Sequence, residues 1–81
     1  MFTYPYNFSI TYACGAKISA DTTLSLTAAA HYARELVQSA PDAVSNVDVI
    51  DNYTGEVVYT ISAKVSVITT VEIEEYSPYN V

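Results

Sequence analysis

The sequence contains few of the residues that interrupt regular structure. Its 81 positions include two glycines, three prolines, one cysteine and no tryptophan. Because glycine and proline are scarce, loops must be short and most residues must belong to helices or strands. A single cysteine excludes an internal disulfide, so packing must hold the fold, which suits a reducing cytosol. A chain of this length buries about 60% of its unfolded surface, which is enough for one modest core.

Long apolar runs and clusters of basic residues are also missing. No stretch approaches the roughly 18 uninterrupted apolar residues of a membrane span, and the first residues lack the basic start of a signal peptide. We therefore expect one soluble, cytoplasmic domain over residues 1–81. Three basic residues against nine acids cannot neutralise a phosphate backbone, whose contacts dominate nucleic-acid affinity. Direct nucleic-acid binding is not expected.

Signals of catalysis or metal binding are weak. His31 is the only histidine, and it pairs most simply with Glu35 on one helix surface. Cys14 is expected as a small buried residue at a strand end, and nothing brings it to His31 as nucleophile and base. Zinc-ligand spacings, phosphate loops and calcium loops are absent, and Glu72 with Glu74 fits a solvated strand better than a cation site. We expect no enzyme activity, no cofactor and no metal.

Residues 4–12 alternate in polarity as a half-buried strand does, with aromatic residues and Ile10 on one side. Gly15 then permits a turn into a short return strand over residues 16–20. Four tyrosines, Tyr59 among them, are explained as sheet residues whose hydroxyls reach water.

Residues 26–40 have the periodicity of a helix, with apolar residues at the i, i+3, i+4 and i+7 spacing. Ser25 is the expected N-cap, and Pro41 should end the helix near Ser39. The apolar stripe is rich in alanine, so the helix axis can lie close to a sheet. The expected solvent face consists of Thr27, His31, Arg34, Glu35 and Gln38.

A hairpin follows, with its turn at residues 51–55. A four-residue loop would place Val49 opposite Val58 and Asp48 opposite Tyr59. The last element is predicted as one long strand over residues 65–75 with an acidic C-terminal end, followed by a loose tail over residues 77–81.

These elements predict an α+β fold in the order β-β-α-β-β-β: a mostly antiparallel sheet of four to five strands with one helix packed on one face. The other face would be open to water or to a partner. Ile50, Val57 and Ile68 do not fit the covered face, so we expect an apolar patch on the open one.

The acidic excess lies entirely in the second half of the chain. Residues 1–41 carry equal numbers of basic and acidic side chains, whereas residues 42–81 carry seven acids against Lys64 alone. This asymmetry indicates a partner with a basic surface, or simply a well-solvated face. Tyrosines beside carboxylates would suit an arginine-rich partner, through charge-assisted bonds and cation–π contacts. The predicted partner-binding residues are Asp48, Asp51, Tyr53, Glu56, Glu72, Glu74, Glu75 and Tyr76.

In size, acidity and lack of catalytic residues, the chain resembles the small inhibitor proteins that phages use against bacterial defence, anti-CRISPR proteins especially. The resemblance rests on no motif and carries over no site residues. It implies an acidic inhibitor in the bacterial host cytosol that imitates nucleic acid and blocks a basic surface of a defence nuclease, such as a CRISPR effector. The alternative is a structural or assembly protein, a virion component or a self-associating module, in which a strand pairs edge to edge in a homodimer.

Overall fold

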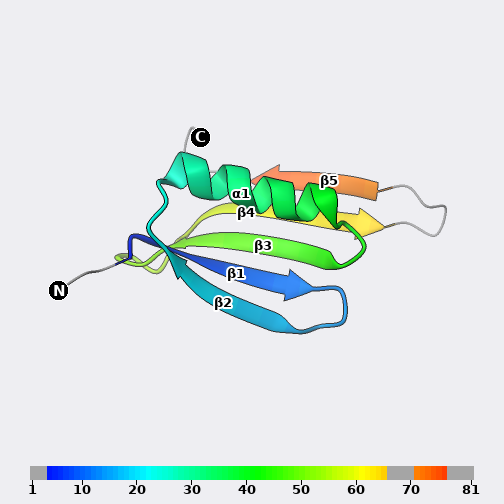
Figure 1. Ribbon diagram of the computed structural model, residues 1–81, viewed down its shortest axis with the longest axis horizontal. Helices are drawn as coiled ribbons and strands as arrows, with labels where there is room; N and C mark the ends of the chain where they lie inside the picture. The colour runs from blue at the N-terminus through cyan, green and yellow to red at the C-terminus, as the bar shows by residue number, and fades with distance from the viewer. Residues whose placement is uncertain (1–3, 66–70, 77–81) are drawn as a thin grey trace.

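The computed structural model describes residues 4–65 and 71–76, which form a single antiparallel sheet with one helix across it (Figure 1). The order of the strands in the sheet is β2-β1-β3-β4-β5. This architecture confirms the predicted α+β fold. The elements are β1 (Tyr6–Tyr12), β2 (Lys17–Thr22), α1 (Leu26–Ser39), β3 (Val44–Asp51), β4 (Val57–Val65) and β5 (Val71–Tyr76).

The helix begins and ends where its local sequence predicts. The Ser25 hydroxyl accepts a hydrogen bond from the Ala28 backbone N–H at 3.3 Å, which satisfies one donor of the first turn. The helix ends at Ser39, two residues before Pro41. Its small apolar residues face the sheet, so the two layers pack closely.

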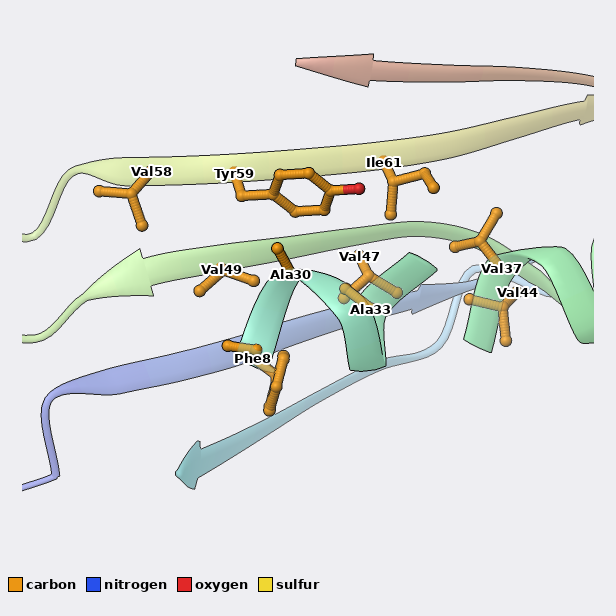
Figure 2. Close-up of a cluster of buried hydrophobic side chains, with 11 residues drawn as sticks. Phe8, Ala30, Ala33, Val37, Val44, Val47, Val49, Val58, Tyr59 and Ile61 are labelled. Atoms are coloured by element: carbon orange, nitrogen blue, oxygen red, sulfur yellow. The ribbon is translucent and has the colours of Figure 1, made fainter. Parts of the chain in front are cut away.

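The core lies between α1 and the middle of the sheet, as Figure 2 shows. Alanines from the helix meet β-branched and aromatic side chains from β1, β3 and β4, and little space remains between the two layers. The helix packs against β3 and β4, and the edge strand β2 lies clear of it (Figure 1). The buried apolar residues are Phe8, Ala29, Ala30, Ala33, Val37, Val44, Val47, Val49, Val58, Tyr59 and Ile61.

The turn between β1 and β2 is tight, and the return strand it leads into is confirmed. Tyr12 N–H donates to the Ala16 carbonyl at 2.8 Å, and Gly15 N–H donates to the Tyr12 carbonyl at 2.9 Å. Gly15 has a φ of 95°, a conformation in which glycine avoids the Cβ penalty. Cys14 lies in this turn and is exposed, so the expectation of a buried cysteine was wrong.

The hairpin between β3 and β4 has the predicted loop but a different register. Asp51 N–H donates to the Glu56 carbonyl at 2.8 Å, which closes a four-residue loop. Beyond it a β-bulge intervenes, so Val49 lies opposite Tyr59 instead of the predicted Val58. The bulge inserts Val58 as an extra residue in β4, and both it and Tyr59 are buried.

The bulge also displaces the second predicted pair, because Asp48 lies opposite Thr60 and not opposite Tyr59. The prediction of one strand over residues 65–75 was wrong as well. Val65 ends β4 and pairs with Val71 of the antiparallel β5, so the chain reverses direction between them. An alternating run of β-branched residues continues on both sides of the reversal and gives no sign of it. The predicted tail at 77–81 lies outside the described residues.

Candidate partner-binding site

Strand β5 is an edge strand whose six residues are all exposed. Its pairing with β4 places Glu72 opposite Lys64, Glu74 opposite Ser62 and Tyr76 opposite Thr60. Side chains of alternate residues share one face of a strand, so Glu72, Glu74 and Tyr76 lie together. Their face is the one that α1 does not cover. Three predicted partner-binding residues are therefore adjacent.

Asp48 extends this group toward the centre of the sheet. It lies opposite Thr60 on β4, which in turn lies opposite Tyr76 on β5, so the three form a row across the uncovered face. The Thr60 hydroxyl and the Asn46 amide both donate to Asp48 Oδ1, the latter at 3.0 Å. These bonds fix the half-buried carboxylate in place. The name acidic face is used below for Asp48, Glu72, Glu74 and Tyr76.

Glu75 lies on the opposite side of β5, against the helix. Arg34 donates to it with two nitrogens, Nε to Oε1 at 3.0 Å and Nη2 to Oε2 at 3.4 Å. The two side chains are 34% and 39% exposed, so the prediction that Arg34 belongs to the solvent face was wrong in this respect. The hydrogen bond to Glu75 raises the pKa of Arg34 above its ordinary value. Glu75 thus joins β5 to α1 and points away from the acidic face.

Tyr59 lies beside this ion pair, inside the core. It is 1% exposed, and its hydroxyl oxygen has no hydrogen-bond partner in the described part of the chain. Burial raises the pKa of this hydroxyl, and the negative charge of Glu75 raises it further. The expectation that the Tyr59 hydroxyl reaches water was therefore wrong. Figure 2 shows its ring on β4 between the side chains of Val58 and Ile61, within the buried cluster.

The hairpin turn holds the other three predicted residues. Asp51 Oδ1 accepts hydrogen bonds from the Tyr53 N–H at 2.8 Å and the Thr54 N–H at 3.4 Å, so its carboxylate stabilises the turn. Tyr53 is 73% exposed and Glu56 is exposed as well. Glu56 precedes Thr60 by four residues along the chain, or roughly 13 Å of extended chain. The three predicted residues of the turn are therefore spatially separate from the acidic face.

The apolar patch expected on the uncovered face is small. Ile50 and Val57 lie opposite each other near the hairpin turn, and Val57 is exposed. Ile68 lies outside the described residues. The neighbouring positions on this face carry polar side chains, including Asn7, Ser9 and Thr60. Among the described residues, this face is therefore polar and acidic, with the aliphatic pair Ile50 and Val57 near the hairpin turn.

Catalytic groups are not brought together in the described segments. His31 Nε2 lies 3.2 Å from Glu35 Oε1 on the exposed side of α1, as the sequence predicted. Within residues 4–65 and 71–76, no three His, Cys, Asp or Glu side chains are placed to hold a metal ion. An open hollow on the helix surface is lined by Glu35, Gln38 and Ser39. No helix in this part of the chain is long and apolar enough to cross a membrane.

Comparison with known proteins yields no relative. No protein-family model, no curated protein and no solved structure matches the chain.

Proposed function

We propose that this protein binds a protein partner through its acidic face and is not an enzyme. The observation that supports this most directly is the position of β5: an exposed edge strand that carries Glu72, Glu74 and Tyr76 on an uncovered face. The partner has a basic surface of the kind that nucleases use to hold nucleic acid. The protein acts as an inhibitor of such an enzyme, like the anti-CRISPR proteins that it resembles in size and charge.

The arrangement of charge supports a nucleic-acid mimic. Glu72 and Glu74 are about 7 Å apart along the strand, and Asp48 lies two strands away, about 10 Å across the sheet. A sheet fixes the backbone positions that carry these carboxylates, so a basic channel can contact them without ordering a flexible segment. Tyr76 adds a ring on which an arginine side chain of the partner can stack.

The backbone of β5 offers a second means of attachment. One side of the strand pairs with β4, and in the described part of the chain its other side is unpaired. A strand of the partner can add to this edge through main-chain hydrogen bonds. The glutamates then give the docking its charge specificity.

Charge reversal tests this proposal. The double variant Glu72→Lys, Glu74→Lys should lose a partner that the unmodified protein captures from a bacterial lysate, and should lose inhibition of the nuclease so identified. The matched control reverses Glu35 and Asp42, two exposed acids outside the acidic face, and should retain both. Glu75 is unsuitable for this test because its reversal breaks the pair with Arg34.

Salt gives an independent test, because charge-driven binding weakens as ionic strength rises. If the Glu72/Glu74 variant captures and inhibits the same nuclease as well as the unmodified protein does, the charge-mimic proposal is wrong.

The alternative function is that of a self-associating or structural protein. The feature that favours it is that β2 and β5, the edges of the sheet formed by the described residues, are paired on one side only.

A further inference from the structure

Strand β2 is the second edge of the sheet, and its sequence is complementary to itself. The strand reads Lys17-Ile18-Ser19-Ala20-Asp21-Thr22, with a basic residue near one end and an acidic residue near the other. The first five residues are all exposed. The helix lies over β3 and β4, so it leaves this edge clear (Figure 1).

The hydrogen bonds of the β1–β2 turn determine which groups face outward. Tyr12 N–H donates to the Ala16 carbonyl, so these two residues form a hydrogen-bonded pair. Such pairs alternate along an antiparallel ladder. Ile18 and Ala20 therefore bond inward to β1, while the N–H and C=O groups of Lys17, Ser19 and Asp21 point away from the sheet.

We propose that two copies of this chain pair through β2, antiparallel, about a two-fold axis at Ser19. In this register Ser19 lies opposite the same residue of the second copy, and Lys17 lies opposite Asp21 twice. All the outward N–H and C=O groups of these residues are then paired in six main-chain hydrogen bonds. The 52% exposed side chain of Ile18 lies opposite Ala20 of the other copy.

Hydrogen bonds within its own chain already orient the Asp21 side chain for this contact. Asn7 and Asn52 donate to its Oδ1 at 3.0 and 3.1 Å, and these bonds lower the pKa of the carboxyl group, the bond from Asn7 most of all. The carboxylate is therefore ionised and fixed in direction on the edge strand. A lysine opposite it can bind at the second oxygen, Oδ2.

The same pairing does not suit β5. Its three glutamates fall within four consecutive positions, so a two-fold antiparallel pairing centred on the strand places glutamates opposite or diagonal to each other. Like charges opposite each other destabilise a sheet. Pairing through β2 instead gives a ten-stranded sheet with both helices on one side and the two acidic β5 strands at its far ends. The dimer would present its acidic edges to two partner molecules.

Sedimentation equilibrium over about 10 μM to 1 mM, a range suited to a moderate affinity, tests the proposal. The unmodified chain should reach twice its monomer mass and go no higher. Lys17→Glu and Asp21→Lys should each weaken the dimer by at least about tenfold, because each places like charges opposite each other twice. The double variant, and an equimolar mixture of the two single variants, should restore it. Asp42→Lys, a matched charge reversal at an exposed residue outside the sheet, should dimerise normally.

A cysteine variant tests the register. In a Cys14→Ser background, Ser19→Cys places two thiols opposite each other at a Cα separation of about 5.5 Å, within disulfide range. Oxidation should link the copies covalently. Lys17→Cys in the same background should not link, because its two thiols lie about 13 Å apart along the strands. A strict monomer at every concentration, larger assemblies, or failure of the charge exchange to restore dimers would overturn the proposal and leave the acidic-face proposal untouched.

Discussion

Replacing Tyr59 with phenylalanine removes one oxygen atom from the core and leaves the aromatic ring in place. The hydroxyl is buried and, in the part of the chain that is described, has no hydrogen-bond partner. Mutational data put the cost of burying such a hydroxyl at about 1–3 kcal/mol. The lower part of this range applies, because Arg34 and Glu75 lie near enough for their charges to act on the hydroxyl. We therefore expect Tyr59→Phe to raise the free energy of unfolding by about 1 kcal/mol.

Urea denaturation followed by circular dichroism measures this change directly, and a domain of this size should gain about 4–8 °C in Tm. Tyr53→Phe is the control, because that hydroxyl is on an exposed turn residue and its loss should change stability by less than about 0.5 kcal/mol. A loss of about 1 kcal/mol or more in Tyr59→Phe would refute the reasoning. It would mean that the hydroxyl makes a stabilising hydrogen bond to the Arg34–Glu75 pair.

The pH dependence of the same variant has a definite sign. The folded protein raises the pKa of Tyr59 above its ordinary value of 10.0, so the fold favours the neutral phenol. The stability that this shift contributes is fully present below the pKa that Tyr59 has in the unfolded chain. It is lost as the pH rises through the pKa that Tyr59 has in the folded chain. Above about pH 10 the unmodified protein should therefore lose stability more steeply than Tyr59→Phe. If the free energies of unfolding of the two proteins fell in parallel above about pH 10, the raised pKa of Tyr59 would be contradicted.

Three further predictions concern packing, the ion pair and the turn. Ala33 is fully buried against the sheet, so Ala33→Leu should cost about 1–3 kcal/mol in a denaturant titration, whereas Thr27→Leu on the exposed side should change stability by less than about 0.5 kcal/mol. A double-mutant cycle of Arg34→Ala and Glu75→Ala should give a coupling energy of about 1 kcal/mol that falls with added salt; zero coupling at low salt would count against the contact. Gly55 has a φ of 76°, so Gly55→Ala should destabilise the hairpin by about 1 kcal/mol, seen as a lower Tm.

The predicted site residues show how far sequence reasoning reached. Glu72, Glu74 and Tyr76 share one face because alternation along a strand is a local property. The sequence could not show that Glu75 would meet Arg34, which is 41 residues away in the chain and reaches it only when the helix packs on the sheet. The bond from Thr60 to Asp48 was missed because the predicted register put Tyr59 in that position.

Local sequence by itself determined the kinds of elements and many of their ends. The hydroxyl of Ser25 and the ring of Pro41 delimit the helix, and the alternation of apolar and polar residues identifies β1. Both signals are local, because helix caps and the direction of successive side chains depend on backbone geometry within a few residues. Only the tertiary structure decided the register beyond Val58 and the reversal between β4 and β5. The register depends on which side chains fill the space under the helix, and the reversal depends on the pairing of β5 with β4; both are settled only when distant segments meet.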